Sequence, residues 1–386
     1  MRHATDMIYL DYAASAPLRP PVARRYAELQ AAHWANPSSL HLAGARAREV
    51  LEEARRFLQG TLGAGRVLFN SGATEGNNTV LQGLLQGGEP GRVLAPATAH
   101  ASILEPLKRL QQQGVEVELL PVDGVGRLRL EALEGALAVK TRLLCLQLAD
   151  NETGTLQPLG EITTLVRERS PRTRIHLDAV HAYGRRRIDL EEDRVDSLVL
   201  SGHKLGAPRG IGLLACRRPE ALHPLIMGGG QEEGLRGGTE NPAAAAALAL
   251  AAELALGECN AEERRLGGMR RRLITGLGES IPELRINGQE EGGLPHILNL
   301  SCPGAPGETV LHFLAEQGIM VGTGSACSGR KKGPSHVLQA MGLPERAAHS
   351  ALRISWGHAT REEEIDRLLA ELPPIVARLR RLGVDR

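Results

Sequence analysis

Lysine is scarce in this chain, and one lysine stands where an amine can do chemistry. The 386 residues include 46 lysines and arginines, of which only five are lysine. Lys204 follows an apolar run, residues 198–200, that predicts a buried strand, and a second apolar run starts at Ile211. Partial burial lowers the pKa of an amine toward its nucleophilic neutral form, which forms a Schiff base with an aldehyde. The alternative interpretation is a surface lysine whose stem lies along apolar neighbours.

Asp178 follows another predicted strand, residues 174–177, upstream of Lys204. A carboxylate in such a place meets a need of pyridoxal phosphate (PLP). The pyridine nitrogen of PLP must stay protonated if the ring is to accept electrons. An aspartate here is also compatible with a helix N-cap. Beside a strand-end lysine, Asp178 favours a PLP site.

A segment rich in glycine and hydroxyl groups, Ser71 to Asn78, follows a predicted strand and opens a predicted helix. Free backbone N–H groups and the helix dipole make such a helix start an anion site. The segment has no Gly-Lys-Ser/Thr, so it is not a nucleotide P-loop. It suits a cofactor phosphate, with a plain N-cap as the alternative.

Three further polar residues stand at places that chemistry can use. His100 follows a predicted strand at the same sheet edge, where it can stack on a flat cofactor and move protons. Asn151 closes another strand and can donate to a ring oxygen or a carboxylate. Arg353 lies in an apolar stretch, so it needs an anionic partner. A substrate carboxylate or an internal acidic residue would serve.

Cys327 lies in a glycine-rich basic loop, residues 322–333. The neighbouring Arg330, Lys331 and Lys332 favour the thiolate, and a loop lets a thiol reach into a site and leave it again. Cys145 and Cys216 lie in predicted strands, which indicates inert core residues.

The elements that must position these residues alternate along the middle of the chain. Predicted strands lie at 66–69, 92–95, 115–121, 142–148, 174–177, 197–200 and 211–216, with helical stretches at 77–85, 101–113, 128–137 and 159–169. This alternation predicts an α/β fold with a mostly parallel sheet and helices on both faces. Ligands of such sheets bind at the carboxyl ends of the strands.

The pattern changes after about residue 260 and predicts a second, smaller α+β domain. An alanine-rich helix, 243–257, precedes a separate charged helix, 261–277, then a strand near 296–301, a helix at 308–317 and two terminal helices. We place the large domain at residues 16–258. The small domain then comprises 1–15 and 259–386 and carries the cysteine loop.

Composition excludes several classes of protein. The net charge of +1 and the lack of a long basic run argue against direct nucleic-acid binding. The apolar run 243–257 is too short to span a bilayer, and the N-terminus lacks the apolar core of a signal peptide. Five widely spaced cysteines with no CxxC pair predict a reducing, cytoplasmic location.

With these motifs in place, the chain resembles the NifS/IscS-type (group I) cysteine desulfurases, which are PLP enzymes of fold-type I and the class-V aminotransferase lineage. The resemblance covers nearly the whole chain, from Ile8 to Gly357. It rests on Asn36-Pro-Ser-Ser-Leu-His41, Ser71-Gly-Ala-Thr-Glu-Gly-Asn-Asn78, Asn151-Glu-Thr-Gly154, His176-Leu-Asp-Ala-Val180, Ser201-Gly-His-Lys204, Gly238-Thr-Glu-Asn241 and Gly324-Ser-Ala-Cys-Ser328.

The resemblance implies a role for each candidate residue. Lys204 would carry PLP and move protons, Asp178 would pair with the pyridine nitrogen, and His100 would stack on the ring. Cys327 would attack the sulfur of L-cysteine and keep it as a persulfide for a sulfur-acceptor protein. The remaining roles are phosphate binding by Ala73, Thr74, Ser201, His203 and Thr239 of the partner subunit of a homodimer, and substrate binding by Asn36, Asn151 and Arg353.

One departure from the family pattern leaves alternatives open. His181 stands where the family usually has a glutamine that donates to the cofactor's phenolic oxygen. Histidine also donates, but it titrates near neutrality, so we expect a pH-dependent cofactor environment. Selenocysteine lyase activity on L-selenocysteine is the nearby alternative. A non-catalytic sulfur carrier or scaffold is a third reading, against which Lys204, Asp178 and Cys327 argue.

Overall fold

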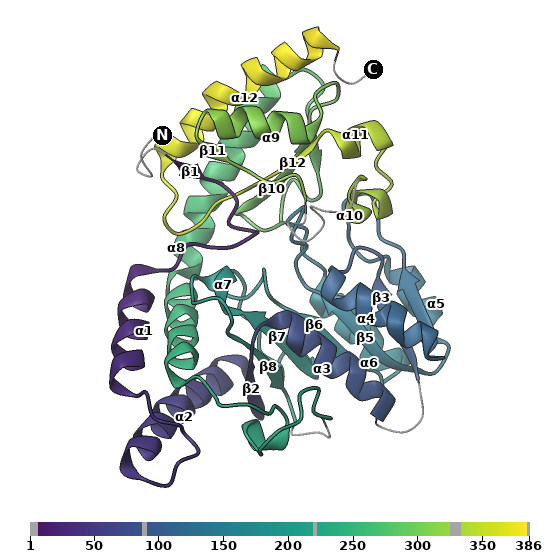
Figure 1. Ribbon diagram of the computed structural model, residues 1–386. Helices are drawn as coiled ribbons and strands as arrows, with labels where there is room; N and C mark the ends of the chain where they lie inside the picture. Colours follow the sequence, from purple (N-terminus) through teal and green to yellow (C-terminus); the bar gives the residue numbers. More distant parts are fainter. Residues whose placement is uncertain (1–6, 87–90, 219–221, 325–332, 384–386) are drawn as a thin grey trace.

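The computed structural model describes residues 7–86, 91–218, 222–324 and 333–383 and is built around one large sheet (Figure 1). Seven strands pair in the order β2-β8-β7-β6-β5-β3-β4. Only β8 runs antiparallel to its neighbours β2 and β7, so the predicted mostly parallel α/β sheet is confirmed. The strands are β2 (Arg66–Asn70), β3 (Arg92–Pro96), β4 (Val117–Leu120), β5 (Thr141–Gln147), β6 (Arg174–Asp178), β7 (Ser197–Ser201) and β8 (Gly212–Cys216).

Helices cover both faces of this sheet, as the alternating pattern predicts. Along β5, Leu144 and Leu146 face the core formed with α2, α5, α6 and α8, whereas Leu143 and Cys145 face α3 and α4. Strand side chains alternate between faces, so both faces of a central strand are buried. The helices are α1 (Pro20–Ala32), α2 (Leu42–Leu62), α3 (Ala73–Gln86), α4 (Ala101–Gln112), α5 (Leu130–Leu137) and α6 (Leu159–Arg169).

A smaller layer stands at the top of Figure 1, around its own core. It contains an antiparallel sheet in the order β12-β10-β9 and a two-stranded parallel sheet of β1 with β11. The strands are β1 (Ile8–Tyr9), β9 (Arg285–Asn287), β10 (Ile297–Ser301), β11 (Ile319–Met320) and β12 (Ala351–Ser355). The helices are α9 (Gly307–Glu316), α10 (His336–Ala340), α11 (Glu345–His349) and α12 (Glu362–Leu382), one more terminal helix than predicted.

One long helix joins the two layers and corrects the sequence prediction. The expected helices at 243–257 and 261–277 form a single helix, α8 (Pro242–Ser280), of 39 residues. Its alanine-rich half packs in the large core and its later residues, such as Leu273, in the small one. Gly257 costs a helix only about 1 kcal/mol, which packing on both cores exceeds. The predicted boundary at residue 258 falls within α8, and the division into domains stays a prediction.

The length and composition of α8 would also allow it to cross a membrane. No other helix among the described residues meets that condition. However, half of its apolar window is buried inside the protein. Its alanines pack against α1 and α2, so the apolar face of α8 is used by the fold itself.

Candidate active site

A cavity of about 430 Å³ opens at the carboxyl ends of the parallel strands. Gln147, Asp178 and Ser201 end β5, β6 and β7, and all three line it. The cavity therefore lies where the sheet topology predicts a ligand. It gathers most of the residues singled out in the sequence: Ala73, Thr74, His100, Asn151, Asp178, His181, Ser201, His203, Lys204 and Arg353.

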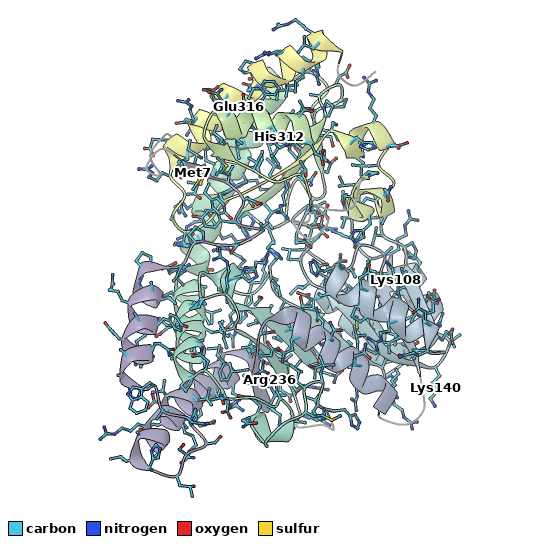
Figure 2. All side chains as sticks on the ribbon, in the orientation of Figure 1. Met7, Lys108, Lys140, Arg236, His312 and Glu316 are labelled. Atoms are coloured by element: carbon cyan, nitrogen blue, oxygen red, sulfur yellow. The ribbon has the colours of Figure 1, made fainter. Side chains whose placement is uncertain are left out.

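Lys204 reaches the cavity from a single helical turn, α7 (Gly202–Leu205), between β7 and β8. The lysine is half-buried, and its Nζ donates to the backbone oxygens of Ala13 and Ala14. Lys108 and Lys140 are exposed at the outer surface (Figure 2). Lys204 is thus the one lysine of the described chain that lines the cavity.

Asp178 is buried at the end of β6, and both of its carboxylate oxygens accept hydrogen bonds. Oδ1 accepts from the N–H of Val180 at 3.2 Å, and Oδ2 accepts from Nδ2 of Asn77 at 3.0 Å. The carboxylate is therefore held in one orientation at the cavity wall.

His100 is the N-cap of α4, and this local role sets its ring. Its Nδ1 accepts from the backbone N–H of Ser102 at 3.1 Å and lies 2.8 Å from the hydroxyl of Ser102. An N-cap side chain satisfies one of the free N–H groups at a helix start. The cap therefore holds the ring at the cavity edge.

The start of α3 offers an anion cradle. Gly72 lies just before the helix at a φ of 152°, and a Cβ there would meet Ser201 Oγ at 3.4 Å. Glu75 accepts from the N–H of Ser71 at 2.8 Å and pairs with Arg236, labelled in Figure 2, at 3.0 Å. These contacts fix the turn at the helix start, where Gly72, Ala73 and Thr74 line the cavity.

His203 also lines the cavity. Burial, with the positive charges of Lys204 and Arg209, lowers the pKa of His203 to about 4, so the imidazole is neutral at neutral pH. Its Nδ1 lies 3.2 Å from the hydroxyl of Ser15. A neutral histidine contributes a hydrogen bond rather than a charge.

Arg353 is 1% exposed and satisfies part of its need for an anion inside the protein. It pairs with Asp11 at 2.7 Å and donates to the backbone oxygen of Asn151 at 3.2 Å. Gln147 donates to Oδ1 of Asn151 at 3.1 Å. Arg353 Nε and Gln147 Oε1 are buried at the cavity wall without a partner among the described residues. Such polar atoms favour a polar ligand.

The setting of His181 corrects one expectation. Burial lowers its pKa well below 6.5, and the positive charge of Lys204 acts in the same direction. His181 is therefore neutral at neutral pH in this structure. The expected titration near neutrality is wrong, because the sequence does not reveal how deeply the ring is buried.

Three candidate residues are not placed at the cavity. Asn36 is exposed and accepts from the N–H of Ser38 at 2.9 Å, and it is absent from the cavity wall. Thr239 is also exposed and outside the wall of this single chain. Cys327 lies outside the described residues, together with Arg330, Lys331 and Lys332.

Sequence reasoning missed other residues around the cavity. Gln147 ends β5 at the same sheet edge as Asp178, so the strand-end rule was sufficient to find it. Ser15 and Arg209 also line the cavity, and no local pattern marks either of them. Asn77 contacts Asp178 from within α3.

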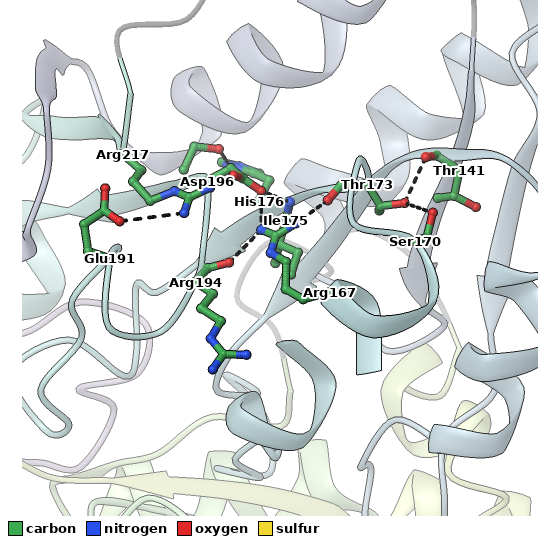
Figure 3. Close-up of polar contacts among 11 residues, drawn as sticks. Thr141, Arg167, Ser170, Thr173, Ile175, His176, Glu191, Arg194, Asp196 and Arg217 are labelled. Atoms are coloured by element: carbon green, nitrogen blue, oxygen red, sulfur yellow. Dashed lines mark hydrogen bonds and ion pairs between the residues drawn. The ribbon is translucent and has the colours of Figure 1, made fainter. Parts of the chain in front are cut away.

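A polar network holds together the amino-terminal ends of β6 and β7, at the opposite ends of these strands from the cavity (Figure 3). Asp196 accepts from Arg167 and Arg217 at 2.6 Å each, and from the N–H of Ile175 at 2.8 Å. Arg167 also donates to the backbone oxygen of Thr173. These contacts join the starts of β6 and β7, which keeps Asp178 and Ser201 in register at their carboxyl ends.

Comparisons with known proteins agree with this geometry. The profile of the family described as Aminotransferase class-V matches residues 8–368. The cysteine desulfurase IscS 1 of Archaeoglobus fulgidus is 39% identical over 381 residues, covering 98% of this chain and 99% of that protein.

Two solved structures give the same result. One described as a NifS-like protein has a TM-score of 0.90 at 32% identity, over 96% of this chain and 99% of its own. One described as SspA in complex with cysteine has a TM-score of 0.79 at 31% identity, over 90% of this chain and 98% of its own. The chain belongs to the NifS/IscS-type cysteine desulfurases of the class-V aminotransferase family.

Proposed function

We propose that this protein is a PLP-dependent cysteine desulfurase that removes sulfur from L-cysteine. The net reaction converts L-cysteine and a protein thiol to L-alanine and a protein persulfide, so every atom is accounted for without an added oxidant. The observation that carries the proposal is one cavity lined by Lys204, Asp178, His100 and Arg353. The relative named cysteine desulfurase and the neighbour in complex with cysteine support the choice of substrate.

The residues of the cavity fit PLP. Lys204 supplies the amine, Asp178 the fixed carboxylate, and the start of α3 a cradle for a phosphate. Gly72 leaves room beside Ser201 that a Cβ would occupy. The unpartnered Arg353 Nε and Gln147 Oε1 suit polar groups of a ligand. PLP would draw electrons from bonds at the substrate Cα.

Each residue then has a task in the reaction. Ala73, Thr74, Ser201 and His203 would hold the phosphate of PLP, and Lys204 Nζ would hold the cofactor and move a proton. Neutral His181 would donate a hydrogen bond to the phenolic oxygen of the cofactor. Arg353 and Asn151 orient the substrate carboxylate, and the Asp11 contact keeps the guanidinium in place.

Cys327 is the proposed acceptor of the sulfur. Its thiolate attacks the substrate sulfur, the carbon–sulfur bond breaks, and the carbon takes up a proton to give alanine. A sulfur-acceptor protein of an iron–sulfur cluster or tRNA-thiolation pathway then takes the sulfur from the persulfide. We propose a cytoplasmic homodimer in which Thr239 of each subunit reaches the phosphate site of the other.

The test measures whether the sulfur of L-cysteine is transferred to the protein as a persulfide. Wild-type protein loaded with PLP should form one persulfide per chain from L-cysteine and release alanine, measured by mass spectrometry of the labelled peptide and by alanine assay. Cys327→Ser should still bind PLP and cysteine but lose nearly all alanine release. Cys259→Ser is the matched control, because Cys259 lies on α8 far along the chain from the loop. Wild-type cysteine turnover by Cys327→Ser would contradict the persulfide mechanism.

Selenocysteine lyase activity is not favoured, since the relatives are named for cysteine. Assaying L-selenocysteine beside L-cysteine separates cysteine desulfurase activity from selenocysteine lyase activity. Selenium leaves carbon more readily than sulfur does, so Cys327→Ser should lose more of its activity on L-cysteine than of its activity on L-selenocysteine. A wild-type protein that releases alanine only from selenocysteine would reverse the assignment.

A further inference from the structure

Asn77 lies beneath the cavity and makes three contacts that join its walls. The side chain is 0% exposed and does not line the cavity. Its Nδ2 donates to Asp178 Oδ2 at 3.0 Å and to Ser102 Oγ at 2.8 Å. Its Oδ1 lies 2.9 Å from His176 Nε2. Asn77 thus contacts Asp178 itself, Ser102 next to His100, and the buried His176.

Donor and acceptor requirements fix the orientation of this amide. The Asp178 carboxylate accepts at both oxygens, so the Asn77 atom facing it must be the donor Nδ2. The opposite atom, Oδ1, then faces His176 and must accept. Burial lowers the pKa of His176 to about 4, so the ring is neutral, with its one proton on Nε2. The hydroxyl of Ser197 then donates to His176 Nδ1 at 2.8 Å.

The same requirements continue from Asn77 to His100. Ser102 Oγ accepts the second N–H of Asn77, which leaves the hydroxyl hydrogen of Ser102 to donate. It donates to His100 Nδ1 at 2.8 Å, and the Ser102 backbone N–H donates to the same atom at 3.1 Å. Nδ1 of His100 therefore carries no proton. The proton of the neutral ring is on Nε2.

We propose that Asn77 is a positioning residue that links Asp178 to His100 and holds His100 in its Nε2–H tautomer. This tautomer makes the ring a hydrogen-bond donor at Nε2 and not a base there. Asn77 acts through its neighbours, since it does not reach the cavity itself. The meaning of this link for catalysis rests on the proposed function, whereas the tautomer is a property of the protein before any substrate binds.

The experiment reads the tautomer by NMR. Protein carrying ¹⁵N-labelled histidine is recorded without and with PLP, and the His100 signals are assigned by their loss in His100→Gln. Wild-type His100 should show an unprotonated Nδ1 and a protonated Nε2 in both forms. A proton on Nδ1 of wild-type His100 would overturn the proposal.

Two variants and a control test the link. Ser102→Ala removes only the hydroxyl, and Asn77→Asp replaces the donor that faces Asp178. Asn77→Asp should populate the Nδ1–H form of His100 and weaken PLP binding about tenfold, the size of effect expected when a hydrogen bond to a charged group is lost. Ser102→Ala keeps the backbone N–H donor to Nδ1, so the Nδ1–H fraction should rise in it too, but less than in Asn77→Asp. Asn78→Asp is the matched control. Its half-buried side chain donates to the backbone oxygen of Thr74 and not to Asp178 or Ser102, so both readouts should stay at wild-type values.

The variants also separate a coupling role from a structural one. Should Asn77→Asp fail to fold, Ser102→Ala still reports, because the backbone cap of α4 does not need the hydroxyl. Wild-type His100 signals in folded variants of both residues would overturn the link. Loss of cysteine turnover in the wild type, with the tautomer as described, would contradict the proposed function and leave this inference standing.

Discussion

His181 shows how strongly burial decides the chemistry of a single residue. Its ring is buried beside Lys204, and its pKa lies well below 6.5. Since the ring is already neutral at neutral pH, His181→Gln should leave the dependence of activity on pH unchanged from about pH 6.5 to 8. Initial rates across that range provide the measurement. An inflection near pH 6.5 that disappears in the variant would contradict the neutral ring.

The same pKa predicts an effect on stability, and its sign follows from proton binding. The unfolded chain protonates His181 near pH 6.5, whereas the folded state does so only at lower pH. Below pH 6.5 the unfolded state therefore holds more protons, and stability falls as pH drops. His181→Gln should reduce the loss of unfolding free energy between pH 7.5 and 5.0, measured in urea. An equal loss in the wild type and the variant would rule this out.

Arg353 combines an internal ion pair with a place at the cavity wall. Arg353→Gln removes the charge that would bind a substrate carboxylate, so kcat/KM for L-cysteine should fall about 10- to 100-fold, mostly through KM. Asp11→Asn is the matched control, because it keeps an oxygen acceptor for the arginine. Its effect should be much smaller, and equal losses in both variants would place the substrate carboxylate elsewhere.

At the scale of elements, a buried ion pair holds the turn that precedes α8. Arg55 of α2 pairs with Glu232 at 2.7 Å, and Glu232 also accepts from the N–H of Phe69 at 3.0 Å. Glu232 and Glu233 both have positive φ, at 47° and 59°, which costs energy for residues other than glycine. The ion pair therefore stabilises a strained turn that carries Arg236 toward Glu75.

This pair gives a matched prediction. Glu232→Gln should lower the free energy of unfolding by about 3 kcal/mol, because it removes the buried counter-charge of Arg55 and leaves only the more exposed Glu52 at 3.2 Å. The neighbouring Glu233 is 57% exposed and pairs with Arg66 at 2.8 Å, so Glu233→Gln should cost less than about 0.5 kcal/mol. Urea unfolding of the two variants measures the difference. Equal effects would show that the turn does not depend on the buried pair.

At the scale of the whole molecule, the expected homodimer predicts that each active site uses both subunits. The Lys204→Ala and Thr239→Ala variants should each have low desulfurase activity when assayed alone. A dimer mixed from the two variants has one site with both Lys204 and Thr239 intact, so mixing after unfolding and refolding should recover activity. Sedimentation measures the oligomeric state. The activity recovered by the mixture measures whether each site uses residues of both subunits. A fully active monomer, or no recovery in a mixed dimer, would contradict it.

The sequence alone was sufficient to predict those elements and site residues that have a strong local pattern. The seven strands of the large sheet were predicted within two residues at each end, because apolar runs between helical stretches are typical of buried parallel strands. Asp178 and His100 were found from their places at strand ends, since the carboxyl ends of parallel strands meet at one edge.

Only the tertiary structure decided features that depend on distant neighbours. The joining of two predicted helices into α8 follows from packing against two cores, which no local pattern encodes. The neutral state of His181 follows from its burial, and the contacts of Asn77 join residues up to 101 positions apart. Spacing along the chain therefore determined which residues reach the site, whereas burial and hydrogen-bond partners in three dimensions determined their charge and orientation.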